Sequence, residues 1–204
     1  MNTRPDNGKL RRMLRQQRRE LPTTQARACA LQLARHAVHH PLVRNCRHIG
    51  AYIAVNGEMD PAPLLERLRA EGKIIYLPVL IPFREGKLWF ARHEPGADLV
   101  HNRFGIPEPV ARQLVNPAML DLVLTPLVAC DPAGHRVGMG GGFYDRSFAF
   151  RRWRRHWHKP LLLGMAYRFQ LQQAIAPNRW DVALDAIATE QGVLRASHSQ
   201  DTSD

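Results

Sequence analysis

The sequence predicts an α/β fold, a three-layer α/β/α sandwich on a mostly parallel, Rossmann-like sheet. Amphipathic helical segments alternate with short apolar, β-branched runs, an order typical of parallel sheets covered by helices on both faces. Residues 48–80 carry one complete strand–helix–strand unit, which implies parallel pairing and a right-handed crossover. We expect one domain over residues 1–194 and a disordered polar tail over residues 195–204.

The first half of the chain is punctuated by clear start and stop signals. Pro22 interrupts an apolar pattern of helical spacing, and Gly72 follows a leucine stripe. Asp60 is a suitable N-cap, with Pro61 at the first helical position. The expected elements are a helix over 9–20, a helix over 24–39, a strand over 48–55, a helix between Asp60 and Gly72, and a strand over 73–80.

The second half is richer in proline and glycine. Residues 131–134 place Asp, Pro and Gly where a type I turn favours them. Residues 94–117 are proline-rich, and we expect them to be irregular. The other expected elements are strands over 87–92, 122–128, 161–166 and 182–188, a helix over 143–156 and a short helix over 170–174.

The most informative motif is the run of residues 138–142, in which only Met139 is not glycine. Glycine loses more backbone freedom on folding than any other residue, so such a cluster indicates backbone N–H groups that approach a ligand closely, most often a phosphate. An apolar strand precedes the run and a helix follows it, but neither the dinucleotide fingerprint nor the P-loop pattern matches. The alternative is a glycine-rich turn without a chemical role.

The chain is strongly basic, with a formal net charge of +11 over 204 residues. Basic residues cluster at 11–19 and at 151–159, and Trp153 and Trp157 interleave with the second cluster, which suits the stacking of bases. No recognised nucleic-acid motif is present, so a solvated helix face or a small polyanionic ligand explains the charge better than nucleic acid. We therefore do not expect nucleic acid as the partner.

Compartment and membrane association follow from two further observations. No apolar run approaches the ~20 residues that span a bilayer, so no membrane partner is expected. Cys29, Cys46 and Cys130 are odd in number and far apart, which favours a reducing cytoplasm over a disulfide framework. Cys130 is a candidate nucleophile, but its apolar surroundings favour a buried structural thiol.

In an open α/β sheet, ligands bind beyond the carboxyl ends of the strands. Glu58 and Asp60 follow the first expected strand and are candidates for binding a polar ring or an amine, although Asp60 is equally explained as an N-cap. Asp145 follows the glycine run and is a candidate Mg²⁺ ligand, with Asp181 or Asp185 as a second carboxylate. The alternative for Asp145 is an acid in the first helical turn, stabilised by the helix dipole.

Six motifs in order resemble the 5-formyltetrahydrofolate cyclo-ligases, also called methenyltetrahydrofolate synthetases. They are LRQQRREL, VNGEMD, LPVL, GIPEP, LTPLVACDPAGHRVGMGGGFYDR and WDVALDAIATE, and the resemblance covers nearly the whole chain. It implies an α/β sandwich and an enzyme that uses ATP and Mg²⁺ to convert 5-formyltetrahydrofolate into 5,10-methenyltetrahydrofolate, with release of ADP and phosphate.

The resemblance also implies site residues. Positions matching the ATP site are Arg11, Arg12, Arg15, Arg136, Val137, Gly138, Met139, Gly140, Gly141, Gly142, Phe143 and Tyr144. Positions matching the folate site are Arg15, Val55, Glu58, Asp60, Met139, Gly140, Gly141, Gly142 and Phe143. The implied metal ligands are Asp145 and Asp185, and the candidate catalytic residues are Arg136, Tyr144 and Asp145.

The chemistry implied by the resemblance is phosphorylation of the formyl oxygen followed by attack of N10. Phosphoryl transfer requires mainly positioning and charge neutralisation, so no protein nucleophile is needed. Two other functions stay open: another phosphate-ester or CoA-handling enzyme on a related α/β scaffold, and a basic nucleic-acid-binding module. We expect a monomer whose partner is its small-molecule substrate.

Overall fold

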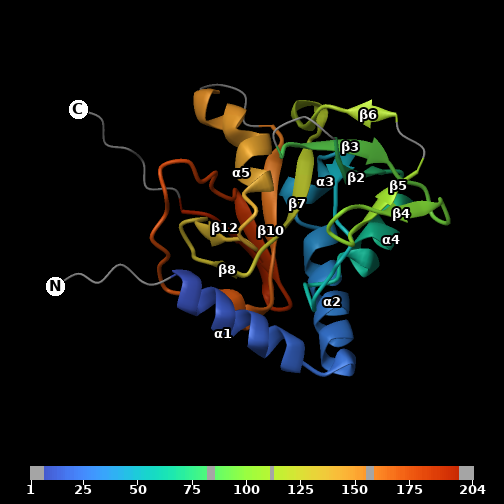
Figure 1. Ribbon diagram of the computed structural model, residues 1–204. Helices are drawn as coiled ribbons and strands as arrows, with labels where there is room; N and C mark the ends of the chain where they lie inside the picture. Colours follow the sequence, from blue (N-terminus) through green and yellow to red (C-terminus); the bar gives the residue numbers. More distant parts are fainter. Residues whose placement is uncertain (1–6, 82–85, 111–112, 155–158, 198–204) are drawn as a thin grey trace.

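The computed structural model describes residues 7–81, 86–110, 113–154 and 159–197 (Figure 1). The main strands are β1 (His48–Gly50), β2 (Ile74–Leu80), β3 (Leu88–Arg92), β6 (Leu114–Val115), β7 (Leu122–Pro126), β10 (Leu161–Met165), β11 (Ala186–Thr189) and β12 (Gly192–Arg195). Within the described residues they form an eight-stranded sheet in the order β12-β11-β10-β7-β1-β2-β3-β6.

The centre of this sheet is parallel. Strands β2, β1, β7, β10 and β11 pair in parallel, and β3, β6 and β12 add antiparallel pairings at the two sides. The parallel strands, numbered by their order in the chain, follow the sequence 2-1-3-4-5, one of the two common doubly wound arrangements. The predicted mostly parallel sheet and its strand–helix–strand unit are confirmed.

Helices cover both faces of the sheet, as the sandwich requires. The helices are α1 (Asn7–Glu20), α2 (Thr23–Val38), α3 (Pro41–Arg44), α4 (Ala62–Ala70) and α5 (Phe143–Phe148), and short 3₁₀ turns span Pro117–Met119, Ala149–Trp153 and Arg168–Gln170. In β7, Leu122 and Leu124 pack into one core cluster and Val123 into the other, the period-two alternation of a strand buried on both faces. Figure 1 shows α4 and α5 on opposite sides of the central strands.

The first strand is shorter than the expected span of 48–55. It ends at Gly50, although Ala51 N–H still donates to Tyr76 O at 2.7 Å. The chain then turns away through Asn56 and Gly57, whose φ angles are 53° and 74°. A Cβ at Gly57 would lie 3.0 Å from the carbonyl oxygen of Arg18, so the turn packs tightly on α1. This close turn directs residues 51–60 over the end of the sheet.

The helix expected over 143–156 is wrong beyond Phe148, where α5 gives way to the 3₁₀ turn Ala149–Trp153. Phe148 and Phe150 both pack on the same core cluster, with ring centroids 6.2 Å apart. Residues two apart point away from each other on an α-helix, so both rings reach the core only if the helix stops. Residues 155 and 156 of the expected helix lie outside the described part of the chain.

The proline-rich segment is more regular than expected. It holds a hairpin of β4 (Leu99–His101) and β5 (Pro107–Pro109), followed by β6. Asn102 Oδ1 closes the hairpin loop by accepting from Phe104 N–H at 2.9 Å. Glu108 is buried and accepts from Leu80 N–H at 2.9 Å, which ties the hairpin to the sheet. Side-chain hydrogen bonds, which no periodicity reveals, therefore order this segment.

Three expectations near the C-terminus are also corrected. The strand expected over 182–188 starts only at Ala186, and the helix expected over 170–174 is replaced by the 3₁₀ turn that ends at Gln170. The disordered tail does not begin at residue 195, because Arg195 ends β12 and Ser197 N–H donates to Pro132 O at 2.9 Å. Residues 198–204 of that tail lie outside the described residues.

Candidate functional site

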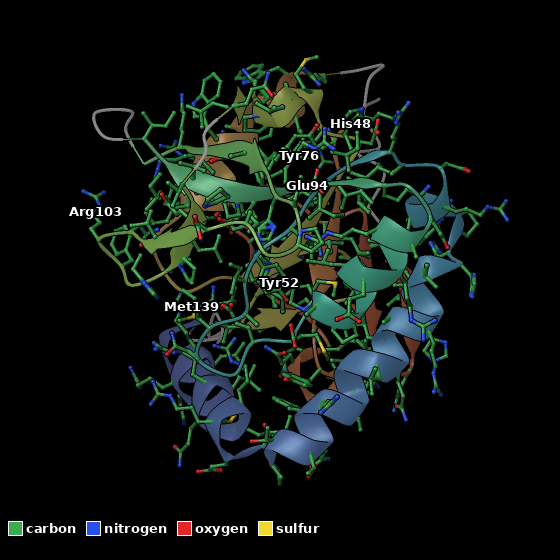
Figure 2. The ribbon with its side chains drawn as sticks, turned by 90° about the vertical axis from the view of Figure 1, so that its right-hand side faces the viewer. His48, Tyr52, Tyr76, Glu94, Arg103 and Met139 are labelled. Carbon is green, nitrogen blue, oxygen red and sulfur yellow. The ribbon has the colours of Figure 1, made fainter. Side chains whose placement is uncertain are left out.

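The topology creates a crevice at the carboxyl ends of β1 and β7. The chain leaves β1 for α4 on one face, and leaves β7 through the hairpin of β8 (Ala129–Cys130) and β9 (Arg136–Val137) for α5 on the other. Neighbouring strands whose connections diverge in this way leave a ligand crevice between them. In Figure 2, Tyr52 and Met139 lie toward α1, and His48 and Tyr76 lie at the opposite end of the sheet.

The glycine run, residues 138–142, forms a loop at this crevice. The predicted turn before it is confirmed, because Gly134 N–H donates to Asp131 O at 2.9 Å. Gly140 and Gly142 have φ angles of 107° and 62°, and Gly142 is the N-cap of α5. A Cβ added at Gly138 or Gly140 would meet no described atom within 4 Å. The loop backbone therefore borders open space, as a phosphate cradle must.

The remaining loop residues lie between α1 and the β4–β5 hairpin. Val137 is buried in β9, whereas Met139 is 40% exposed. The Phe143 ring meets Phe104 edge-on with centroids 5.5 Å apart, and Gly141 O accepts from Arg146 Nη2 at 2.6 Å. The hairpin tip thus contacts the end of the glycine loop.

Helix α1 brings arginines to the same loop. Arg11 Nε donates to Gly138 O at 2.8 Å. Arg15 Nε is buried and has no hydrogen-bond partner among the described residues, a state that Arg69 Nε and Arg151 Nε share. Arg12 is exposed. The helix therefore brings Arg11 to the loop, and Arg15 follows one helical turn later.

Arg18 is a site residue that the sequence analysis left in a basic cluster. Its side chain is buried and its donors reach the loops after β1 and β7: Nε donates to Asn56 O at 3.1 Å and Nη1 to Leu127 O at 3.3 Å. Burial lowers the pKa of the Arg18 guanidinium, and the nearby Glu58 carboxylate partly offsets that effect. In sequence, one pattern could have identified Arg18. Arg11, Leu14 and Arg18 are spaced three and four residues apart, so they share one helical face, on which Leu14 is buried.

A polar cluster follows β1. Glu58 is buried, and its Oε2 accepts from Val55 N–H at 3.2 Å. Burial raises the pKa of the Glu58 carboxyl, and the Val55 N–H and Arg18 oppose that shift. Tyr52 OH donates to Met59 O and Tyr167 OH donates to Glu58 O, the latter at 3.4 Å. These bonds fix the loop that carries Glu58.

A cleft of about 820 Å³ opens beside this cluster, between α1, the start of α2 and residues 56–60. Its polar lining includes Arg18, Arg27, Asn56, Glu58, Asp60 and Tyr167. Asp60 also accepts from Ala62 N–H through Oδ1 at 2.9 Å, so it serves the helix start and faces the cleft at once. Burial raises the pKa of Tyr167 to about 12, which keeps its hydroxyl a donor. The cleft is large enough for a drug-sized ligand.

The three candidate catalytic residues lie behind the glycine loop. Arg136 Nη2 donates to Asp145 Oδ1 at 2.6 Å, and that oxygen also accepts from Val182 N–H at 3.1 Å. Tyr144 packs on Phe148 with centroids 6.0 Å apart. Burial raises the pKa of the Tyr144 hydroxyl, with a smaller contribution from Glu58. Asp145 thus sits beside the loop with a buried arginine as its partner.

The structure does not join the two candidate metal ligands. Asp185 precedes β11, at the amino end of that strand, and both its carboxylate oxygens accept from Arg151 Nη2 at 2.8 and 2.7 Å. Asp145 binds a different arginine, Arg136. Over the part of the chain that is described, no group of three or more His, Cys, Asp or Glu residues is placed to hold a metal ion.

The second basic cluster is largely occupied within the protein. Arg151 binds Asp185, Arg152 Nη1 donates to Arg179 O at 3.2 Å and Arg154 Nη1 donates to Lys159 O at 2.7 Å. Trp153 is 84% exposed, and Trp157 lies outside the described residues.

Cys130 is fully buried, and burial raises its pKa to about 12. A thiol with so high a pKa is a poor nucleophile near neutral pH, in agreement with the structural thiol that the sequence favours.

Comparison with known proteins shows the family and the fold. The family model described as the 5-formyltetrahydrofolate cyclo-ligase family matches residues 3–190. The 5-formyltetrahydrofolate cyclo-ligase of Escherichia coli is 38% identical over 183 residues, covering 89% of this chain and 98% of that protein. The protein of the same name from Haemophilus influenzae is 36% identical over 177 residues, covering 86% of this chain and 92% of that protein.

Solved structures agree with these relatives. The NMR structure of Aquifex aeolicus 5,10-methenyltetrahydrofolate synthetase superposes with a TM-score of 0.77 at 28% identity, covering 97% of this chain and 96% of that one. A Mycoplasma pneumoniae 5,10-methenyltetrahydrofolate synthetase shares the fold, with a TM-score of 0.70 at 23% identity, covering 91% and 99%. In the described residues, no helix is long and apolar enough to cross a membrane. This chain belongs to the 5-formyltetrahydrofolate cyclo-ligase family.

Proposed function

We propose that the protein converts 5-formyltetrahydrofolate into 5,10-methenyltetrahydrofolate with consumption of ATP. Family membership supports the reaction. The observation that carries the proposal is the glycine loop at the crevice, where the backbone of Gly138 and Gly140 borders open space next to the α1 arginines. A nucleotide phosphate needs both features, namely close backbone approach and cationic donors.

The phosphates of ATP would lie on the glycine loop. Arg15 contributes the buried Nε that lacks an acceptor, and Arg11, bonded to Gly138 O, holds α1 against the loop. The Arg136 side chain is only 4% exposed and orients Asp145, so its part in catalysis is to hold that carboxylate. Arg12 would contact only a part of the nucleotide that extends toward solvent, because its side chain is exposed.

The folate would occupy the adjoining cleft. Glu58 and Asp60 offer carboxyl groups to the amino and ring N–H groups of a pterin, and Val55 fixes Glu58 through its backbone N–H. Met139 and Phe143, at the two ends of the loop, would contact the bound molecule from the phosphate side. The basic groups at the cleft rim, including Arg27, suit the glutamate tail of a folate.

This arrangement suits activation of a formamide. Transfer of the γ-phosphoryl group to the formyl oxygen forms a P–O bond and releases ADP. N10 then attacks the formyl carbon, the C–O bond breaks, and inorganic phosphate leaves with the original formyl oxygen while N10 loses its proton. The loop and the arginines of α1 neutralise the charge that moves, so the protein needs no nucleophile.

We also propose Mg²⁺ as the metal, held mainly by the phosphates and by one protein carboxylate. Asp145 fits this role because it lies in the first turn of α5 beside the glycine loop, and its hydrogen bonds to other described residues use only Oδ1. Both oxygens of Asp185 already accept bonds from Arg151, so it fits less well. When bound, Mg²⁺ would neutralise charge on the β- and γ-phosphates.

The three cysteines are unpaired in the structure, which supports a reducing cytoplasm as the location. We propose a monomer, because the sites suggested here are completed within one chain.

The direct test is a mixture of the protein, MgATP and 5-formyltetrahydrofolate, followed by the absorbance of the methenyl product. Product should form only when all three are present, with one ADP released per product. Equal turnover without ATP would overturn the proposal and favour another activity of the same scaffold.

A further inference from the structure

Arg18 borders the proposed folate cleft, but its hydrogen bonds are made to the protein itself. It is 2% exposed, yet its neutral acceptors come from three separate segments. They are Asn56 O in the loop after β1, Leu127 O after β7 and Met139 Sδ in the glycine loop, at 3.1, 3.3 and 4.0 Å. These segments border the folate cleft and the phosphate loop on either side of the crevice.

Burial of a cation against neutral acceptors is unfavourable, so the position calls for a reason. None of the acceptors bonded to Arg18 among the described residues is a carboxylate oxygen. An apolar side chain would fill the same space without the cost of removing a charge from water. Only a guanidinium offers donors in several fixed directions from one planar group, and so bridges three segments at once.

The neighbouring backbone strengthens this bridge. Gly57 packs so closely on α1 that a Cβ there would lie 3.0 Å from Arg18 O. Arg18 therefore contacts the loop after β1 through its side chain, at Asn56, and through its backbone, at Gly57. Helix α1 is held to the glycine loop by Arg11 as well.

We propose that Arg18 is a positioning residue that holds the folate cleft and the phosphate loop at the separation needed for phosphoryl transfer. The inference rests on the proposed function, because it concerns two ligands that must meet. Although Arg18 borders the folate cleft, its donors are taken by protein acceptors, so we expect its loss to change ligand affinity little and to misalign the formyl oxygen and the γ-phosphorus. Misplacement by about 1 Å is enough to slow such a reaction by roughly 100-fold.

The test compares Arg18→Met, Arg18→Lys and the control Arg35→Met with the parent protein. Arg35 is an exposed arginine on α2 without a part in the site. Turnover is followed by methenyl absorbance, and the affinities for a non-hydrolysable ATP analogue and for 5-formyltetrahydrofolate are measured separately by calorimetry. Folding is checked by circular dichroism and thermal melting.

Arg18→Met should lower kcat by roughly 100-fold while each dissociation constant changes by less than about 3-fold. Arg18→Lys should be intermediate, because it keeps the charge but not the planar fork. Arg35→Met should match the parent. If Arg18→Met does not fold, Arg18→Lys provides the test: the proposal requires that its kcat falls more than its affinity for either ligand.

Three results would overturn the inference. The first is a folded Arg18→Met variant with the kcat of the parent. The second is a variant whose affinity for one ligand falls as much as its turnover. The third is an Arg18→Lys variant whose kcat falls only because a fraction of the protein is unfolded. An inactive parent would instead contradict the proposed function, so the two failures are distinguishable.

Discussion

The two edges of the parallel sheet differ in how their charged groups are paired, although each holds an ion pair, since Arg136 binds Asp145 at the carboxyl edge. At the amino edge, carboxylates that precede the strands are paired with cations: Asp121 with Lys159 at 2.6 Å, and Asp185 with Arg151 at 2.7 Å. At the carboxyl edge, Arg18 donates only to neutral acceptors within the described residues, and among those residues Arg15 Nε, which is buried, has no acceptor. In Figure 2, His48 lies near the top of the view, and Tyr52 and Met139 lie lower, nearer to α1.

This difference in charge pairing suggests that the amino edge serves stability and the carboxyl edge serves ligand binding. At the amino edge Asp121 also accepts from the N–H groups of Arg47 and His48, both at 2.9 Å, so its carboxylate organises the start of β1. The oxygens of Asp121 and Asp185 are thus occupied by bonds within the protein, although Arg151 Nε, like Arg15 Nε, is buried without a partner among the described residues. Unpaired cationic donors at the other edge cost stability in the empty protein and are satisfied when an anion binds.

At the carboxyl edge, we expect the largest effect on turnover from Gly138→Ala. Gly138 has no positive φ, and a Cβ there meets no described atom within 4 Å, so the protein itself tolerates alanine. A phosphate in the cradle would meet the methyl group, and turnover should fall at least about 100-fold with no loss in thermal stability. Steady-state kinetics and thermal melting on the same samples give the two quantities.

The matched control is Gly96→Ala, which also has open space but a φ of 78°. It should show the reverse pattern, a loss of about 1 kcal/mol in stability with normal turnover. Normal activity of Gly138→Ala would show that the phosphates do not lie on this part of the loop.

Asp185→Asn removes an ion pair at the amino edge. The change leaves the Arg151 guanidinium, whose side chain is 11% exposed, without its charge partner. The free energy of unfolding should drop by about 2–3 kcal/mol, somewhat less than for a fully buried pair. Urea denaturation measures the drop, and an unchanged Mg²⁺ titration of the remaining activity should accompany it. A steep rise in the Mg²⁺ requirement would instead restore Asp185 as a metal ligand.

Asp145→Asn is the counterpart of Asp185→Asn, since it too removes the partner of a buried arginine. Both variants should be destabilised, but only Asp145→Asn should raise the Mg²⁺ concentration for half-maximal activity, by about tenfold. Activities are normalised to folded protein before the Mg²⁺ titrations are compared. Equal titrations of the two variants would reduce Asp145 to the partner of Arg136.

Glu58→Gln should give the smallest effect, a gain in stability that depends on pH. Burial raises the pKa of the Glu58 carboxyl above its unfolded value, so between those two pKa values the folded protein binds more protons than the unfolded one. Stability from this group is therefore present below the unfolded pKa and lost as pH rises through the folded pKa. Thermal melting from pH 4 to pH 8 should show Glu58→Gln ahead of the parent only at the higher pH; a constant difference would mean that Glu58 does not titrate in this window.

The sequence carried more information about the glycine loop than about what surrounds it. Spacing and turn chemistry place Gly138 to Gly142 correctly between a strand and a helix, because those rules are local. The length of β1 and the end of α5 depend on tertiary contacts, namely the packing of Gly57 on α1 and of Phe150 on the core. Periodicity does not reveal such contacts.

The site residues show the same division. Motif resemblance named Glu58, Arg15 and Asp145 as candidates, and the structure brings them to the carboxyl edge. Only its helical spacing with Arg11 and Leu14 distinguishes Arg18 from its neighbours in sequence, because the carbonyls that it binds lie 38 and 109 residues away in the chain. Asp185 resembles a metal ligand in sequence, but the sheet places it at the opposite edge, with Arg151.

The most direct test of the contrast between the two edges is amide hydrogen exchange with and without 5-formyltetrahydrofolate and a non-hydrolysable MgATP analogue. The account predicts slower exchange in peptides that cover residues 55–58 and 138–142 when both ligands are present. Peptides that cover residues 47–48 and 183–186, at the amino edge, should exchange at an unchanged rate. Protection at the amino edge, or none at the glycine loop, would contradict the assignment of the site.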